Sequence, residues 1–175
     1  HGSGRFRGGA PARYVRRARR QDRPDRQLRP DIAVEAWDLS KGRVAAGVRE
    51  MERLKLSGRV VMRAGSALEL EPLGAPDAIL VDAPCSGSGT WRRHPEGKWR
   101  LSPENLEELT ELQYRLLCRA FSLVKKGGKV VYSTCSLLAA ENEEVVEKAL
   151  RAFPEISERP LSADFGGIAC GRGGV

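Results

Sequence analysis

The sequence predicts an α/β domain that is built on a mostly parallel β-sheet. Short apolar segments alternate with longer segments whose apolar residues recur at helical spacing, which is typical of strands that alternate with helices. The run Ala78–Val81 is apolar at every position, as expected of a strand that is buried on both faces. Pro103 precedes a long helical pattern, and the first turn of a helix tolerates proline well. We therefore expect a ligand site beyond the carboxyl ends of the strands, where sheets of this class bind their ligands.

The first predicted elements are a strand, a helix and a second strand. The first strand is Ile32–Trp37, and Asp38 follows it directly. Ser40 can cap a helix that continues to about Lys55 and that carries its apolar residues on one face. The second strand is Arg59–Arg63.

Further elements follow the apolar run Ala78–Val81. A long loop comes first, and the helix that begins at Pro103 ends before the pair Gly127-Gly128, because glycine favours helix ends. The predicted elements are a helix Pro103–Val124, a strand Lys129–Tyr132 and a helix Glu141–Arg151.

Composition indicates one folded domain with a basic arm. The chain has 175 residues, of which 41% are hydrophobic, and this is enough for a core. Its net charge of +7 comes from residues 1–30, because the other 145 residues carry 20 basic and 21 acidic side chains. No apolar run approaches the ~20 residues that span a bilayer. A soluble, cytoplasmic, monomeric protein is the default expectation.

The four cysteines form no CxxC pair, and only two histidines accompany them, so we expect no metal site. Cys118 lies among leucines in the predicted helix and fits a small buried hydrophobe. Cys170 lies in a glycine-rich tail and carries no signal.

The other two cysteines belong to two motifs that each follow a predicted strand. The first motif is DAPCSGSGT, which contains Asp82, Pro84 and Cys85, and the second is YSTCS, which contains Cys135. Because the carboxyl ends of parallel strands meet at one edge of a sheet, we expect two thiols and one carboxylate near a common cleft.

Several segments together resemble the Nop2/Sun (RsmB-like) family of RNA cytosine-C5 methyltransferases. They are DAPCSGSGTWRRHPEGKW, then Gln113, KKGGKVVYSTCS and ENE, and the resemblance extends from about Trp37 to Leu150. Cytosine-C5 DNA methyltransferases also place a cysteine after a proline, but they lack the TCS cysteine. The resemblance implies a Rossmann-like class I fold, S-adenosyl-L-methionine as cofactor, and a ribosomal or transfer RNA as substrate.

The resemblance also implies a role for each motif residue. The family uses the TCS cysteine, here Cys135, to add to C6 of cytosine, which makes C5 nucleophilic. Asp82 would stabilise the adduct at N3 of the base, and Cys85 would take part in release of the product. Pro84 would help to shape the base pocket.

The cofactor residues implied by the resemblance are Asp38, Ser66, Asp82 and Pro84. An acidic residue at the end of such a strand typically binds the ribose hydroxyls of a nucleotide-like ligand, although Asp38 could also be a capping or surface aspartate. Ser66 stands where the family usually has an aspartate. Arg43, where the family often has a basic residue, could be an ordinary exposed helix charge.

The loop after Cys85 offers candidates for RNA contact. Its basic side chains could bind phosphates or could simply be solvated, and its two tryptophans could stack on bases or pack in the core. These residues are Trp91, Arg92, Arg93, His94, Lys98 and Trp99.

The sequence departs from the family at both ends. The family's first strand and its cofactor loop, of the type MCAAPGGKT, should precede Asp31, and the final strand pair should follow about Pro160, but neither is recognisable. Back-translation of Tyr14–Asp22 with CGN codons for arginine, read one base forward, is compatible at every codon with MCAAPGGKT. We therefore expect residues 1–30 to be a disordered basic arm or an out-of-frame segment, residues 31–160 to form an incomplete catalytic domain, and residues 161–175 to be an irregular tail.

This loss would leave Ile32–Trp37 without its neighbouring strand and would weaken or abolish cofactor binding. Two alternatives to a methyltransferase remain open. One is a noncatalytic RNA-binding remnant of the same fold, and binding of S-adenosylmethionine distinguishes it from the enzyme. The other is a thiol hydrolase that uses Cys135 with His94, which needs the imidazole within hydrogen-bond reach of the sulfur.

Overall fold

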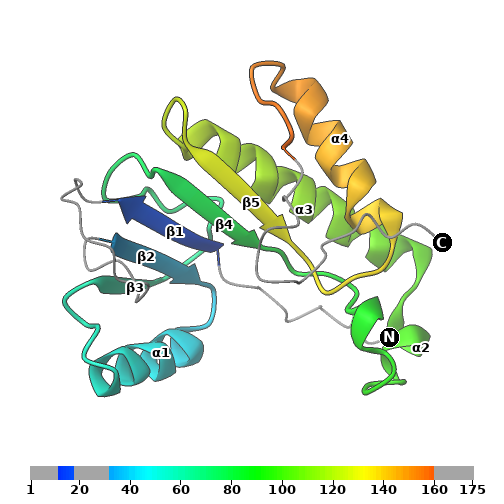
Figure 1. Ribbon diagram of the computed structural model, residues 1–175. Helices are drawn as coiled ribbons and strands as arrows, with labels where there is room; N and C mark the ends of the chain where they lie inside the picture. Colours follow the sequence, from blue (N-terminus) through cyan, green and yellow to red (C-terminus); the bar gives the residue numbers. More distant parts are fainter. Residues whose placement is uncertain (1–11, 18–31, 160–175) are drawn as a thin grey trace, which may run out of the picture.

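The computed structural model describes residues 12–17 and 32–159, which form a five-stranded sheet with helices packed against it (Figure 1). The strand order is β3-β2-β1-β4-β5. Strands β2 and β3 pair in parallel, as do β4 and β5, whereas β1 is antiparallel to both β2 and β4. The strands are β1 (Ala12–Arg17), β2 (Ile32–Asp38), β3 (Val60–Ala64), β4 (Ala78–Asp82) and β5 (Lys129–Ser133).

The centre of the sheet differs from the sequence-based expectation. We expected β2 to lack its neighbour, and this is wrong, because β1 lies between β2 and β4 and pairs with both. Tyr14, for example, stands opposite Glu35 on one side and Ile79 on the other. Backbone groups along the facing edges of two strands need hydrogen-bond partners, and β1 supplies them. The disordered arm that we expected over residues 1–30 is wrong for Ala12–Arg17, which form β1, whereas this strand does not test the out-of-frame alternative. The rest of that segment lies outside the described residues.

The helices begin where their capping residues predict. Ser40 Oγ accepts a hydrogen bond from the Arg43 N–H at the start of α1, and Ser102 Oγ accepts one from the Asn105 N–H at the start of α3. The helices are α1 (Lys41–Arg53), α2 (Gly97–Arg100), α3 (Pro103–Leu123) and α4 (Glu143–Ala152), and two 3₁₀ turns are η1 (Ser88–Thr90) and η2 (Ala139–Glu141). Within the described residues, no helix is both long enough and apolar enough to cross a membrane.

The core lies between the sheet and the α3–α4 pair. Figure 1 shows α1 beside β2 and β3, and α3 with α4 beside β4 and β5. One cluster of buried residues joins β2, β4 and α3, and a second joins α3 to α4. Their fully buried members include Trp37, Ile79 and Val81 in the first and Leu117 and Ala149 in the second.

Strand β4 is less completely buried than its apolar sequence predicts. Ile79 and Val81 are buried, whereas Leu80, which points to the other face of the sheet, is only half-buried. Alternate residues of a strand face opposite sides of a sheet, so the face that carries Leu80 is the less covered one.

Candidate active site

Two neighbouring parallel strands bring the two cysteine motifs together. In the pairing of β4 with β5, Asp82 stands opposite Ser133, so the segments that follow both strands leave the same edge of the sheet. The Sγ atoms of Cys85 and Cys135 are 3.2 Å apart. The Cys135 N–H also donates to Cys85 Sγ at 3.3 Å. The expectation that both motifs open at a common edge is confirmed.

Burial distinguishes the two thiols. Cys135 is exposed, whereas Cys85 is half-buried. Burial, and then the hydrogen bond to Cys135, raise the pKa of Cys85 to about 11. Cys85 therefore keeps its proton at neutral pH and can point its S–H toward Cys135 Sγ. The exposed sulfur is the one that a large substrate can reach.

The other two residues of the first motif lie beside this pair. Asp82, at the end of β4, is half-buried, and its carboxylate has no hydrogen-bond partner among the residues that the structure describes. Pro84 is buried, and its carbonyl oxygen accepts a hydrogen bond from Gln113 Nε2 at 2.8 Å. The arrangement therefore presents one free carboxylate and one exposed thiol at the same edge.

Asp38 and Ser66 form a second group, at the ends of β2 and β3. Asp38 is 5% exposed, and its carboxylate accepts hydrogen bonds from the Ser40 N–H and from Arg43 Nε and Nη2, each at 2.7 Å. Burial raises the pKa of Asp38, but the hydrogen bonds from Arg43 and Ser40 and the charge of Arg43 outweigh it, so the pKa lies below its ordinary value. Arg43 is thus ion-paired, and the reading of it as an ordinary exposed helix charge is wrong.

Ser66 follows Gly65, whose N–H donates to the Asp38 carbonyl oxygen at 3.0 Å and so ties the two strand ends together. Ser66 Oγ accepts from the Leu68 N–H at 3.2 Å and stabilises the turn after β3. The central strand β1 separates this pair from the cysteines, since it stands between β2 and β4 in the sheet. The structure therefore groups the six predicted site residues into two clusters, which lie at the carboxyl ends of the two parallel strand pairs.

The loop after Cys85 is partly folded. The turn η1 and the short helix α2 lie in it, and a small cavity of about 180 Å³ there is lined by Ser86, Trp91 and His94 among others. Trp91 packs against Gly97, whereas Trp99 is 80% exposed beside the Lys98 ammonium group, so the core-packing alternative is wrong for Trp99.

The structure bears on two further expectations: that His94 could serve Cys135 in a thiol hydrolase, and that Cys118 is an inert thiol. His94 Nδ1 lies 3.6 Å from Glu96 Oε1, and no hydrogen bond joins it to Cys135 among the described residues, which gives the hydrolase reading no support. Cys118 is half-buried in α3, and burial raises its pKa, which fits an inert thiol.

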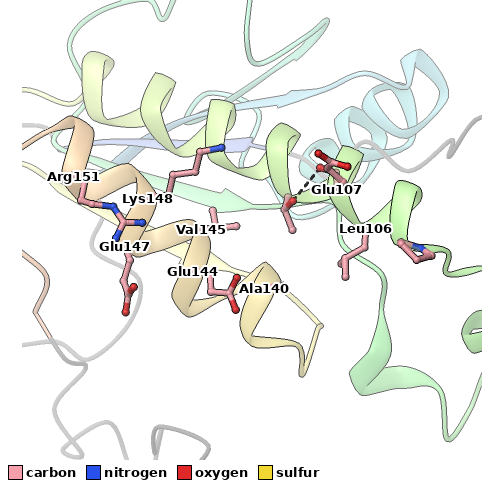
Figure 2. Close-up of a pocket in the computed structure, with 10 residues that line it drawn as sticks. Leu106, Glu107, Ala140, Glu144, Val145, Glu147, Lys148 and Arg151 are labelled. Carbon is pink, nitrogen blue, oxygen red and sulfur yellow. Dashed lines mark hydrogen bonds between the residues drawn. The ribbon is translucent and has the colours of Figure 1, made fainter.

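A larger groove of about 480 Å³ lies between α3 and α4 (Figure 2). Its walls carry Leu106 and Val145 with charged residues around them, such as Glu144, Lys148 and Arg151. None of the predicted site residues lines it, so its size is no guide to the chemistry.

Two residues without a role predicted from the sequence lie next to the cysteine motifs in the structure. Gln113 and Glu141 are both 0% exposed, and both contact the first motif. A signal was present for Gln113, because this polar residue interrupts the apolar face that Leu109 and Leu117 give to α3. A polar side chain on a buried helix face must find a partner in the interior.

Comparison with known proteins identifies the family. The family model of 16S rRNA methyltransferase RsmB/F matches residues 26–174. Ribosomal RNA small subunit methyltransferase B of Thermus thermophilus is 39% identical over 140 residues, which cover 80% of this chain and 34% of that relative. The family match continues to residue 174, and so includes most of residues 161–175, for which we expected an irregular tail and which lie outside the described residues.

Solved structures of related methyltransferases agree with the family match. The crystal structure of PH0851 superposes with a TM-score of 0.69 at 33% identity and covers 74% of this chain and 30% of that one. The structure of NSun6 from Pyrococcus horikoshii with SFG, an analogue of S-adenosylmethionine, superposes with a TM-score of 0.59 at 28% identity. The match covers 67% of this chain and 30% of the NSun6 chain.

The chain spans about a third of the length of the curated relatives that it matches. The fold is that of a partial Rossmann-like methyltransferase. With a family model that matches 26–174, the chain belongs to the RsmB/F family of 16S rRNA methyltransferases.

Proposed function

We propose that this chain contributes the cysteine site of an S-adenosylmethionine-dependent RNA cytosine-C5 methyltransferase that acts on ribosomal RNA. The observation that carries the proposal is the pair of thiols 3.2 Å apart beside the free carboxylate of Asp82. Family membership and the name of the Thermus relative support ribosomal RNA over transfer RNA.

The exposed Cys135 suits the attacking thiolate. Its sulfur would bond to C6 of cytosine, and the electrons of the C5–C6 double bond would become available at C5. Asp82 would act as the acid at N3 of the base: in its protonated form the carboxyl group would donate a hydrogen bond to N3 and stabilise the negative charge that develops on the ring. S-adenosylmethionine supplies the methyl group that C5 takes.

Release reverses the first step. The C5 proton must pass to a base, for which solvent water is available beside the exposed Cys135, and the bond from Cys135 Sγ to C6 must break, so that the C5–C6 double bond and the thiolate re-form. Cys85, in contact with Cys135 Sγ, is placed to assist, since its proton can stabilise the departing thiolate. The raised pKa of Cys85 keeps that proton in place at neutral pH.

The cofactor residues fit only in part. A carboxylate offers about four acceptor positions, and the Ser40 and Arg43 donors use three at Asp38. One position then remains for a ribose hydroxyl. Ser66, which replaces an aspartate, can make one further contact. We therefore expect this chain to bind S-adenosylmethionine weakly.

A second candidate function is an RNA-binding remnant that does not bind the cofactor. The observation that favours it is the combination of Ser66 with the absence of an MCAAPGGKT loop from the sequence. The family match begins at residue 26, after the segment that back-translates to that loop, and this supports an out-of-frame reading of the gene. Resequencing the gene decides whether this segment is read out of frame. AGR codons for the arginines within Tyr14–Asp22 would exclude an out-of-frame reading.

Two measurements test the proposal. Calorimetric titration of S-adenosylmethionine compares this chain with a version in which MCAAPGGKT replaces Tyr14–Asp22, and we expect much tighter binding by the restored version. That version is then incubated with the cofactor and a small-subunit rRNA transcript that contains 5-azacytidine, whose adduct cannot be released normally. We expect a covalent complex that Cys135→Ala abolishes and Cys118→Ala leaves intact. Tight cofactor binding without any adduct at Cys135 would contradict the covalent mechanism.

A further inference from the structure

We infer that Glu141 is a positioning residue that holds the two cysteine loops at a fixed separation, an inference that rests on the proposed function. Glu141 ends the turn η2 and is 0% exposed. Its Oε1 accepts hydrogen bonds from the Ser86 N–H at 2.8 Å and from Gln113 Nε2 at 3.0 Å. Its Oε2 accepts from the hydroxyls of Ser86 and Ser136, each at 2.5 Å.

The donors come from both cysteine motifs. Ser86 directly follows Cys85, and Ser136 directly follows Cys135. One carboxylate therefore joins the residue after each cysteine, across 50 positions of the sequence.

Gln113 extends this link to the other side of Cys85. Its Nε2 donates both to Glu141 Oε1 and to the Pro84 carbonyl oxygen. Because Pro84 and Ser86 flank Cys85, the backbone on both sides of this cysteine is held by the same buried cluster.

Asn142, the residue after Glu141, holds the backbone on both sides of Cys135. Asn142 Oδ1 accepts from the Thr134 hydroxyl at 2.6 Å, and Asn142 Nδ2 donates to the Ser136 carbonyl oxygen at 3.0 Å. Thr134 and Ser136 flank Cys135. The second loop is thus held at both sides as well.

The chemistry of the site requires a carboxylate at position 141. Four donors use the full acceptor capacity of a carboxylate, and no cation forms an ion pair with Glu141 among the described residues. A glutamine there would turn an N–H₂ group toward donors and leave buried hydrogens without acceptors. Among the described residues no hydrogen bond joins Glu141 to either sulfur, so we infer that it acts on the reaction through position.

Disulfide closure tests the separation without substrate or cofactor. Diamide accepts the two electrons and two protons that Cys85 and Cys135 release when their S–S bond forms. The rate of closure, followed by peptide mapping and mass spectrometry, reports how often the two sulfurs meet. The matched variants of this chain are Glu141→Gln and Glu147→Gln, since Glu147 is exposed on the adjacent helix α4.

We expect Glu147→Gln to close at the wild-type rate and Glu141→Gln to close about tenfold more slowly, which is the order of effect of one charge-assisted hydrogen bond. Circular dichroism checks that each variant is folded. Should Glu141→Gln not fold, Ser136→Ala replaces it, with slower closure again expected. This variant removes one of the four donors to Glu141, together with the contacts of the Ser136 hydroxyl with Leu138 and Ser88. Closure of a folded variant at the wild-type rate would overturn the inference, as would failure of the wild type to close.

Methyl transfer gives a second readout in the version with the restored cofactor loop. We expect Glu141→Gln to lower kcat by about 100-fold, as displacements near 1 Å can do, with an unchanged KM for S-adenosylmethionine. An increase in that KM with kcat unchanged would overturn the inference. If no version transfers methyl groups, the proposed function fails, while the closure rates still decide the role of Glu141.

Discussion

Gly89 lies in direct contact with the backbone of Cys135. Its N–H donates to the Cys135 carbonyl oxygen at 3.0 Å, and a Cβ built on Gly89 would come within 2.8 Å of the same oxygen. The loop of the first motif can approach the second motif this closely only because residue 89 has no side chain. The position of the proposed nucleophile therefore depends on a glycine 46 positions earlier in the sequence.

Gly89→Ala should displace the Cys135 loop and lower kcat for methyl transfer by about 100-fold. Gly58→Ala is the control, because a Cβ at Gly58 meets nothing within 4 Å. The assay uses the version with the restored cofactor loop. Equal kcat values for the two variants would show that the contact at Gly89 does not position Cys135.

Gln113→Leu should destabilise the fold by about 2 kcal/mol, because the Pro84 carbonyl oxygen loses its Gln113 donor and Glu141 loses one of its four donors. Urea unfolding of this chain measures the change. Glu108→Leu, at an exposed position of the same helix, should shift the free energy of unfolding by less than about 0.5 kcal/mol. If Gln113→Leu lowered the free energy of unfolding by no more than Glu108→Leu does, the hydrogen bonds from Gln113 to Pro84 and Glu141 would be contradicted.

Stability at alkaline pH should depend on Cys85. Its pKa rises from 9.0 to about 11 on folding, so the neutral thiol contributes stability that is complete below pH 9. This contribution is lost as the pH rises from 9 through 11. Cys85→Ala should therefore show a shallower fall of the unfolding free energy over this window. Cys118 and Tyr132, whose pKa values are also raised, contribute to the fall in both proteins. Superimposable slopes would refute the prediction.

Arg43→Gln should raise the pKa of Asp38, because it removes two hydrogen bonds and a positive charge from a carboxylate that is 5% exposed. In this chain the lowered pKa of Asp38 gives stability that is present above its unfolded value and is lost as the pH falls below it. Carboxyl titration by nuclear magnetic resonance measures the shift. Arg49→Gln, at an exposed position of the same helix, should leave the Asp38 titration unchanged, and an equal shift in both variants would rule out the specific pair.

Much of the fold was predictable because its signals are local. Ser40 and Ser102 marked the helix starts, and strands β2 to β5 were predicted to within one residue at each end, whereas β1 was not predicted. The meeting of Cys85 with Cys135 also followed from sequence, since parallel neighbouring strands end at one edge. The helix expected from Glu141 begins later, at Glu143, because Glu141 ends a 3₁₀ turn and faces the interior.

The roles proposed for the two thiols rest on the family resemblance, whereas the sequence by itself determined the class of fold and the edge of the sheet at which the two cysteine motifs meet. Those conclusions rest on capping, periodicity and motif spacing, which act over a few residues. Only the tertiary structure decided that β1 fills the centre of the sheet, that Arg43 pairs with Asp38, and that Glu141 joins both cysteine loops. The hydrogen bond between Ser86 and Glu141 links residues that are 55 positions apart in the sequence. A buried carboxylate takes whatever donors the packed chain brings to it, and no local pattern specifies which donors those are.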